Sequence, residues 1–259
     1  MAADHAQLVM VVPTYNEIEN VDSLVARIEA VRGDLRVDVL FVDDGSPDGT
    51  GARIHELRSS RRWIHIVERS GRMGLGSAYR AGFTWAIENG YAEIGEMDAD
   101  LSHDPTYLPA LHAAIASGAN LALGSRYVRG GGSEGWPLQR RLLSRGANVF
   151  ARTLLRLRTR DVTGGFRVYD RDAIEVILEQ GTECDGYGFQ VEGVCAITRA
   201  GMRVVEVPIT FRDRAFGRSK MNGAIVWEAT RRCFALAFEN PRARTTAVPA
   251  FSEGASDGR

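Results

Sequence analysis

The sequence predicts an α/β fold with a mainly parallel central sheet flanked by helices. Three observations predict it: short apolar runs rich in β-branched residues, longer segments with helical apolar spacing, and the alternation of the two through short loops. Strands are expected at residues 8–13, 37–42, 64–67, 91–97, 121–125 and 204–210. Helices are expected at residues 16–31, 50–58, 76–89, 146–158 and 225–238.

The first half of the chain alternates most regularly. Residues 8–13 (LVMVVP) and 37–42 (VDVLFV) are continuous apolar runs of the kind found in strands buried on both faces. The segment between them carries apolar residues three and four positions apart, which is helical spacing. These residues are Ile18, Val21, Leu24, Val25, Ile28 and Val31.

The second half is less regular and contains a glycine-rich segment. Residues 128–137 (VRGGGSEGWP) include four glycines, so a mobile loop that closes as a lid is expected there. No internal repeat or linker divides the chain, and one domain is expected over residues 1–238. The small, polar segment 239–259 predicts a disordered tail.

Composition and charge are those of an ordinary soluble enzyme. With 32 basic and 33 acidic residues, the chain gives no reason to expect nucleic acid as a partner. Cys184, Cys195 and Cys233 have no metal-ligand spacing and cannot all pair, which favours a reducing compartment. Residues 1–7 lack a secretory signal, and the apolar run 225–238 is interrupted by charges and too short to span a bilayer. A cytoplasmic protein is expected.

Acidic residues gather where two of the predicted strands end. Asp98 and Asp100 follow the strand at 91–97, and Asp43 and Asp44 follow the strand at 37–42. Ligands bind beyond the carboxyl ends of such strands, and two carboxylates facing one site suit Mg²⁺ or Mn²⁺. Solvated turns would also explain both strings, and Asp104 before Pro105 is explained as a helix cap alone.

The string GLGSAY at residues 74–79 offers only part of a dinucleotide-binding fingerprint. It has the first two glycines and lacks the third, and it does not follow the first strand. A dehydrogenase that uses NAD is therefore a weak alternative. We expect these glycines to let a helix begin beside the ligand crevice.

Basic residues mark the later part of the chain. Seven arginines lie between residues 140 and 160, which predicts a strongly positive face. Lys220 is the only lysine in a chain of 32 basic residues. An ammonium group suits phosphate binding as a point charge, although a chance surface lysine is an equally simple explanation.

Taken together, the motifs resemble those of an inverting family-two glycosyltransferase with the GT-A fold, and more narrowly of the polyprenol (dolichol) phosphate mannose synthases. The resemblance covers about residues 8–238. The matching strings are VPTYNE (12–17), VDDGSPDGT (42–50), GLGSAY (74–79), MDADLSHDP (97–105), GSRYVRGG (124–131), Trp136-Pro137, DVTGGFR (161–167), GYGFQ (186–190), VVEVPITF (204–211) and GRSKM (217–221).

The resemblance implies roles for individual residues. It implies a nucleotide-sugar half at about 8–128 and a C-terminal acceptor-side lobe at about 129–238. For GDP-mannose it implies a guanosine pocket of Pro13, Tyr15, Glu17, Val42 and Asp44. It implies a diphosphate–metal motif of Asp98, Ala99 and Asp100, with Asp100 as the metal ligand and Ser102 as a second one. It implies Arg126, Arg214, Lys220 and Gln190 around the diphosphate and sugar, and Arg140 at the acceptor phosphate.

The implied reaction is inverting transfer of mannose from GDP-mannose to a polyprenyl phosphate, assisted by Mg²⁺ or Mn²⁺. One alternative keeps the lipid acceptor and replaces the donor with UDP-glucose or another UDP-sugar. A second alternative is a non-catalytic module that binds nucleotide sugars. The basic segment suits an anionic lipid surface, so the protein is expected at the cytoplasmic face of a membrane, peripherally or through a separate anchor protein. The helix at 225–238 is expected to pack on the sheet.

Overall fold

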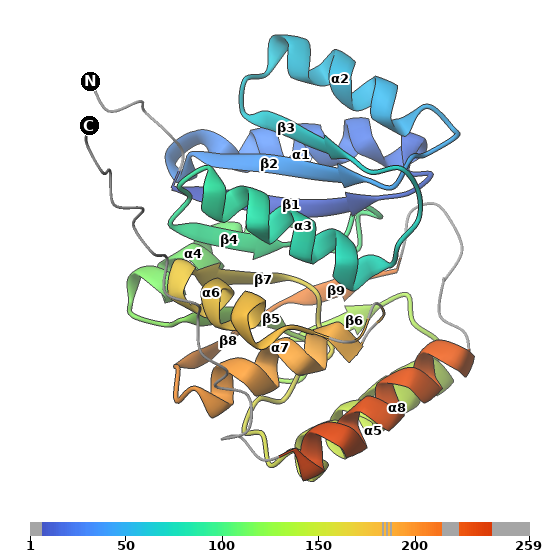
Figure 1. Cartoon of the computed structure of the whole chain (residues 1–259), viewed down its shortest axis with the longest axis vertical. Helices are drawn as coiled ribbons and strands as arrows, with labels where there is room; N and C mark the ends of the chain where they lie inside the picture. The colour runs from blue at the N-terminus through green and yellow to red at the C-terminus, as the bar shows by residue number, and fades with distance from the viewer. Residues whose placement is uncertain (1–6, 183, 185, 187, 214–222, 240–259) are drawn as a thin grey trace, which may run out of the picture.

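The computed structural model describes residues 7–182, 184, 186, 188–213 and 223–239. Its core is a seven-stranded sheet with the strand order β3-β2-β1-β4-β7-β5-β8, and β6 pairs with β9 in a separate two-stranded sheet (Figure 1). The strands are β1 (Leu8–Thr14), β2 (Val37–Asp43), β3 (Ile64–Glu68), β4 (Glu93–Glu96), β5 (Leu121–Ser125), β6 (Gly132–Glu134), β7 (Arg167–Asp170), β8 (Val204–Pro208) and β9 (Thr210–Arg212).

The helices cover both faces of the large sheet, which confirms the α/β class with a mainly parallel sheet. The helices are α1 (Ile18–Leu35), α2 (Thr50–Ser60), α3 (Leu75–Glu88), α4 (Leu108–Ala116), α5 (Leu138–Leu154), α6 (Arg171–Gln180), α7 (Gly188–Arg199) and α8 (Gly223–Phe238). A short 3₁₀ helix, Pro105–Tyr107, precedes α4 and is capped by Asp104 as expected, because the Asp104 side chain accepts from the Thr106 N–H.

Alternate residues of the central strands supply two separate cores. Val9 and Val11 face a cluster built with α3, α6 and α7, whereas Leu8, Met10 and Val12 face a cluster built with α1, α2 and α4. Strands buried on both faces require apolar residues at every position, which explains the continuous apolar runs of β1 and β2.

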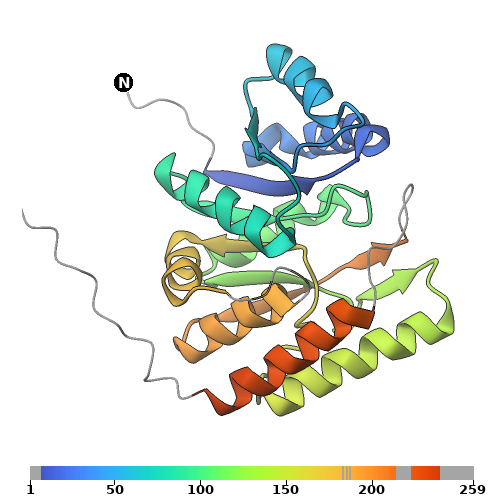
Figure 2. The ribbon, with the colours of Figure 1, turned by 45° about the vertical axis from the view of Figure 1, so that its right-hand side comes forward.

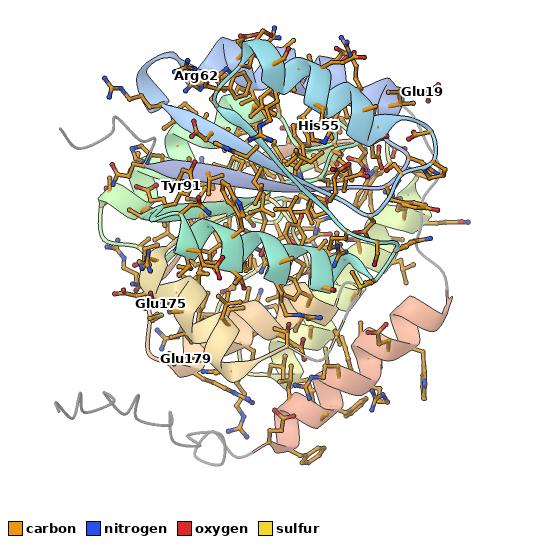
Figure 3. The ribbon with its side chains drawn as sticks, turned by 45° about the horizontal axis from the view of Figure 1, so that its top comes forward. Glu19, His55, Arg62, Tyr91, Glu175 and Glu179 are labelled. Atoms are coloured by element: carbon orange, nitrogen blue, oxygen red, sulfur yellow. The ribbon has the colours of Figure 1, made fainter. Side chains whose placement is uncertain are left out.

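The parallel strands bring their carboxyl ends to one edge of the sheet. Figure 3 places Glu19, at the start of α1, at this edge, and places Arg62 and Tyr91 at the opposite edge. The residues that follow β1, β2, β4 and β5 are therefore neighbours, although they lie far apart in the sequence. This carboxyl edge carries the candidate site.

The structure corrects four expectations for the second half. Strand β7, which the sequence pattern did not predict, runs antiparallel between β4 and β5. The glycine-rich segment includes β6, which pairs with β9, so it is partly a strand. Helix α5 begins at Leu138, eight residues before the expected helix at 146. Helices α6 and α7 were not predicted.

Helix α8 was expected to pack on the sheet and instead lies beside α5 and α7, away from the strands (Figures 1 and 2). Arg232 of α8 forms a buried ion pair with Glu192 of α7, which fixes one side of the helix. The tail expected at 239–259 lies outside the described residues from 240 onward, as do Arg214 and Lys220.

Candidate functional site

Hydrogen bonds tie the loops at the carboxyl edge to one another. The Asp44 N–H donates to the Thr14 carbonyl at 3.0 Å, and the Asn16 N–H donates to Ser46 Oγ at 3.0 Å. Further along the edge, the Arg212 N–H donates to the Ser102 carbonyl at 3.2 Å. These bonds join the loops after β1 and β2 to each other, and the loop after β4 to the end of β9. We call the carboxyl edge of the sheet, with these loops, the rim.

The loop after β4 holds its carboxylates in a fixed arrangement. Asp100 is buried, and its Oδ1 accepts from the Ser102 N–H at 3.1 Å and from Ser102 Oγ at 2.6 Å. Asp98 is half-buried, and Ala99 between the two acids is buried. Leu101 has a φ of 63°, a backbone conformation that is strained for a branched side chain and that is common at functional sites.

His103 fastens the same loop to the core. Its Nδ1 accepts from the Asp98 N–H at 3.1 Å, and its ring stacks on Phe166 with centroids 5.1 Å apart. Phe211 meets the His103 ring edge-on at 5.4 Å. The backbone of the acidic loop is therefore held from one side by a buried imidazole.

Oxygen atoms around Asp98 fit a hard divalent cation. A Cβ on Gly165 would lie 3.9 Å from Asp98 Oδ1 and 3.5 Å from Gln190 Nε2, so the bare glycine leaves space between them. Gln190 Oε1 is buried and has no hydrogen-bond partner among the described residues. Within the described residues no cluster of three or more His, Cys, Asp or Glu side chains could hold a metal ion. Metal binding by Asp98 and Asp100 stays a prediction, in which one or two carboxylates are complemented by phosphate oxygens.

A buried polar network lies beneath this loop. Glu96, the last residue of β4, accepts from the Tyr169 hydroxyl at 2.8 Å and from Gln190 Nε2 at 2.7 Å. Arg167 donates to the Tyr169 hydroxyl and to the Gln190 carbonyl. Burial raises the pKa of the Glu96 carboxyl, and the Arg167 charge opposes that rise. The network fixes the rotamer of Gln190, which was expected to line the pocket.

Tyr79 of α3 lies near the acidic loop and the buried polar network. Its hydroxyl is buried without a hydrogen-bond partner among the described residues, and its ring stacks on Phe189 at 5.7 Å. Burial raises the pKa of the Tyr79 hydroxyl well above its usual value, and the charges of Asp98 and Glu96 raise it further. The tyrosine therefore lies close to the acidic loop in its neutral form.

The glycines of residues 74–79 open α3, as the sequence analysis expected. Gly74 precedes the helix with a φ of 95°. A Cβ on Gly76 would lie 2.4 Å from the Cys184 carbonyl oxygen and 3.2 Å from the Phe189 side chain. The string is therefore explained by close packing of α3 against the segment before α7, and not by dinucleotide binding.

The residues expected around guanosine lie at the carboxyl ends of β1 and β2. Tyr15 and Glu17 are half-buried in the loop after β1, and Pro13 is half-buried within the strand itself. The Val42 side chain lies fully in the core, so any contact it makes to a ligand comes from the main chain. Asp44 is buried at the end of β2. These residues share one end of the rim, and their nucleotide contacts stay predictions.

The structure adds two arginines to this end of the rim. Arg69 follows β3, pairs with the Asp44 carboxylate, and donates to Ser77 Oγ at 2.7 Å. The Arg72 guanidinium lies 5.3 Å from the centre of the Tyr15 ring. The position of Arg69 directly after a predicted strand was a sequence signal for it, because strand ends line the crevice.

Arg126 lies at the end of β5 in a buried ion pair. Its Nε donates to Asp161 Oδ2 at 2.7 Å and its Nη2 donates to Asp161 Oδ1 at 2.6 Å, a bidentate arrangement. The Trp136 and Phe211 rings lie 5.5 and 5.6 Å from the guanidinium carbon. Asp161 lies in the string DVTGGFR, which resembles a motif of the family. Its pairing with Arg126 could not be predicted from the sequence, because the two residues lie in distant segments.

Arg140 lies in the first turn of α5, next to the rim. Its guanidinium carbon is 4.1 Å from the centre of the Trp136 ring, and its Nη1 donates to Asp213 Oδ1 at 2.8 Å. Both side chains of this pair are partly exposed. Trp136 therefore contacts both Arg126 and Arg140, and the structure brings these two predicted residues together.

Helices α5 and α8 lie side by side and expose apolar side chains. Every exposed large hydrophobic residue in the described part of the chain, apart from Met73, belongs to these two helices. We call this set the α5–α8 surface; it comprises Leu138, Leu142, Leu143, Val149, Phe150, Trp227, Phe234 and Phe238. The Phe150 and Phe234 rings meet across the two helices at 5.7 Å. Among the described helices, none is both long and apolar enough to cross a membrane.

Comparison with known proteins identifies the family. Residues 9–178 match the family description "Glycosyl transferase family 2". The chain is 44% identical over 221 residues to the polyprenol monophosphomannose synthase of Mycolicibacterium smegmatis, a match that covers 85% of this chain and 83% of that one. It is 43% identical over 243 residues to the undecaprenyl-phosphate mannosyltransferase of Micrococcus luteus, with 92% and 98% covered.

A solved structure has the same fold at low sequence identity. The glucosyl-3-phosphoglycerate synthase of Mycobacterium tuberculosis, in complex with Mn²⁺, UDP-glucose and phosphoglyceric acid, aligns with a TM-score of 0.65 at 18% identity, over 90% of this chain and 80% of that one. The family match and the curated relatives also confirm the resemblance to polyprenol phosphate mannose synthases. The chain therefore belongs to glycosyl transferase family 2 and is an enzyme of that family.

Proposed function

We propose that the protein transfers mannose from GDP-mannose to a polyprenyl monophosphate, with inversion at the anomeric carbon of the sugar. The observation that carries the proposal is a chain of contacts from the acidic loop to two arginines. His103 accepts from the Asp98 N–H and contacts Phe211, and Phe211 contacts Trp136, whose ring lies beside Arg126 and Arg140. The two curated relatives at 43–44% identity are named polyprenol monophosphomannose synthase and undecaprenyl-phosphate mannosyltransferase, which supports both the sugar and the acceptor.

The donor is assigned to the end of the rim formed by the loops after β1, β2 and β3. Tyr15, Glu17 and Asp44 offer aromatic, carboxylate and main-chain groups to a nucleoside, and Arg69 holds the Asp44 carboxylate in place. A pocket with prearranged polar groups loses little entropy when it binds its ligand. The preference for guanosine over uridine rests on the resemblance of the sequence motifs to polyprenol phosphate mannose synthases, and the donor assay below tests it.

Asp98 and Asp100 are the residues proposed to hold Mg²⁺ or Mn²⁺, with Asp100 as the direct ligand. A cation bound there would supply positive charge next to the leaving diphosphate. Ser102 holds Asp100 Oδ1 through its N–H and its hydroxyl, so its main role is to orient the carboxylate, and a second metal contact from its oxygen stays a prediction. In the predicted scheme Arg126, Arg214 and Lys220 lie around the same phosphates. Because the Arg126 charge is paired with Asp161, most of the added positive charge would come from Arg214 and Lys220.

The acceptor needs no general base in this scheme. A phosphate monoester carries a second pKa near about 6, so at neutral pH its oxygen is already an anion and a nucleophile. The protein's task is therefore to hold two anions, donor diphosphate and acceptor phosphate, close together. Arg140 is assigned to the acceptor phosphate, because it lies beside Trp136 and Arg126 and is partly open to solvent.

The α5–α8 surface is assigned to the membrane that carries the lipid acceptor. Its eight apolar residues are 39–85% exposed, and soluble monomers rarely expose so many neighbouring apolar side chains. Helix α5 also carries Arg140, Arg141, Arg145 and Arg152 and no acidic residue. An apolar face flanked by arginines is typical of a helix that lies in the interface of an anionic bilayer, where each basic residue contributes about 1 kcal/mol.

Vesicle binding tests the membrane assignment. Leu142→Glu/Leu143→Glu places two charges on the surface and should abolish co-sedimentation with phosphatidylglycerol vesicles, while leaving Tm unchanged. Met73→Glu is the matched control, because Met73 is exposed but lies outside α5 and α8. Binding of the double variant at the wild-type level contradicts the assignment, and so does a stable dimer in light scattering that the same substitutions dissociate.

A donor assay tests the reaction. Purified protein, a polyprenyl monophosphate and Mg²⁺ or Mn²⁺ should release GDP from GDP-mannose and form a mannosylated lipid phosphate. Product from UDP-glucose alone would replace the donor assignment and keep the fold and acceptor. No product from either donor would reject the proposed function.

Asp100→Asn tests the acidic loop within that assay. It removes the charge while keeping the size of the side chain, and turnover should fall by at least about 100-fold because a charge-stabilising group is lost. Asp104→Asn is the matched control, because Asp104 caps the next helix and asparagine caps equally well. Equal activity of Asp100→Asn and Asp104→Asn would contradict the role of Asp100.

A further inference from the structure

The indole N–H of Trp136 is a buried donor that meets no acceptor in the described part of the chain. Trp136 is 8% exposed, and its Nε1 has no hydrogen-bond partner among the described residues. Leaving a buried N–H unpaired costs on the order of the desolvation penalty of that group, and each such group in a folded protein calls for an explanation.

The groups around the ring cannot accept from this N–H. The Arg140 and Arg126 guanidinium carbons lie 4.1 and 5.5 Å from the ring centre, and a guanidinium has donors only. The third neighbour, Phe211, meets the ring at an interplanar angle of 65° with centroids 5.2 Å apart. Both arginines are paired with carboxylates, Arg126 with Asp161 and Arg140 with Asp213, so an anion at the indole N–H would compete with Asp213 for Arg140.

Main-chain donors lie next to the indole in sequence. Helix α5 begins two residues after Trp136, and no described side chain caps its N-terminus. The first turn of a helix presents free N–H groups and the positive end of the helix dipole, and both favour an anion. No acidic residue lies in this first turn.

The acid that pairs with Arg140 can give way to a ligand. Asp213 accepts from Arg140 at 2.8 Å, and the two side chains are 43% and 34% exposed. Exposed ion pairs contribute little to stability, so an incoming anion can replace Asp213 at low cost. By contrast, Arg126 is held by the fully buried Asp161 and stays in position.

We infer that Trp136 is a binding residue for the acceptor phosphate: its indole N–H donates to a phosphate oxygen, and its ring positions Arg140 for the same phosphate. This inference rests on the proposed function, because it takes the anion to be a polyprenyl monophosphate. It adds a neutral, directional donor to a site otherwise built from arginine charge, and a directional donor orients the nucleophilic oxygen as well as attracting it.

Calorimetric binding of a short-chain, water-soluble polyprenyl monophosphate to the full chain tests the inference. Trp136→Phe keeps an aromatic ring and removes the N–H, so the Kd for the phosphate should rise about tenfold while the Kd for GDP changes less than about twofold. The Kd for the unphosphorylated polyprenol should not change. Trp136→Leu, which also removes the ring, should weaken phosphate binding further.

Trp63→Phe is the matched control. Trp63 is also 8% exposed and also carries an arginine, Arg32, 5.2 Å from its ring centre. It precedes β3 at the opposite edge of the sheet, where Figure 3 places its neighbour Arg62. Phosphate affinity should be the same in Trp63→Phe and in the wild type. Equal losses in Trp63→Phe and Trp136→Phe would overturn the inference, because they would report general destabilisation.

The indole resonance provides a readout that needs no substitution at Trp136. The chain has four tryptophans, so the Trp136 N–H signal is identified as the one retained in Trp63→Phe, Trp85→Phe and Trp227→Phe. Adding the short-chain monophosphate should move this proton signal downfield. An unmoved signal with bound phosphate overturns the inference alone, whereas a wild-type protein that binds no polyprenyl monophosphate overturns the proposed function and the inference with it.

Discussion

Helices α1 and α5 have similar lengths, 18 and 17 residues, and opposite relations to the rest of the protein. Val21, Leu24 and Ile28 of α1 are completely buried against the sheet. Leu138 and Leu142 of α5 are 70% and 62% exposed. The apolar face of α1 is therefore satisfied within the chain, whereas that of α5 is left for a partner outside it.

Two ion pairs beside Trp136 show a similar contrast between buried and exposed groups. Arg126 and Asp161 are buried and joined by a bidentate contact, whereas Arg140 and Asp213 are partly exposed and joined by one hydrogen bond. Breaking a buried pair leaves an uncompensated charge, but an exposed pair exchanges readily with solvent or ligand. In terms of the proposed function, Arg126 is fixed in the folded chain, whereas Arg140 can exchange Asp213 for the acceptor phosphate.

Removing the acid from each of these two ion pairs should give the largest difference in the free energy of unfolding. Asp161→Ala leaves the Arg126 charge buried and should lower the free energy of unfolding by about 3–5 kcal/mol. Asp213→Ala leaves Arg140 in contact with water and should lower it by less than about 1 kcal/mol. Urea denaturation of the two variants measures both values. Similar losses would remove the distinction between the buried and the exposed pair.

Two glycine substitutions compare the packing of α3 with that of α5. A Cβ on Gly76 of α3 would lie 2.4 Å from the main-chain oxygen of Cys184, so Gly76→Ala should destabilise the protein by about 1–3 kcal/mol. A Cβ on Gly146 of α5 would meet no described atom within 4 Å, and Gly146→Ala should stabilise the protein by about 0.5–1 kcal/mol through helix propensity. Thermal unfolding of both variants should give Tm shifts of opposite sign, and a shift of the same sign would contradict the packing difference.

The smallest effect on stability is expected at the exposed ion pair between Asp22 of α1 and Arg53 of α2. The hydrogen bond from Arg53 lowers the pKa of the Asp22 carboxyl below its ordinary value. A lowered carboxyl pKa stabilises the folded state above the unfolded pKa, and this contribution is lost as the pH falls through the folded pKa. Asp22→Asn should therefore lower Tm by no more than about 2 °C at pH 7, and the difference from the wild type should shrink as the pH falls through the lowered folded pKa of Asp22. A larger Tm shift at pH 7 would mean that the exposure of an ion pair does not decide how much it contributes to the stability of the protein.

Much of the fold followed from local patterns in the sequence. The strands Leu8–Thr14 and Val37–Asp43 and the helix at Ile18–Leu35 lie within a few residues of their expected bounds, because burial on both faces of a sheet demands unbroken apolar runs. Strand β7, Arg167–Asp170, was missed, since a short strand with charged ends carries little periodic signal. Its antiparallel place between β4 and β5 depends on pairing with distant segments.

The candidate site divides in the same manner. Asp98 and Asp100 were identified from their position after a strand, and the structure puts them at the carboxyl edge. Arg69 and His103 were missed, because their importance lies in what they touch: the Asp44 carboxylate and the Asp98 N–H. A hydrogen bond between residues in different loops leaves no local pattern in the sequence.

By itself, the sequence determined the α/β class, the acidic loop at the end of β4 and the glycosyltransferase family, because each depends on residue types at short, regular spacings. Only the tertiary structure decided that Asp161 neutralises Arg126, that Trp136 contacts two arginines and lacks an acceptor among the described residues, and that α5 and α8 expose their apolar faces together. Burial and pairing are properties of segments that meet in space, so their energies are set when the chain folds.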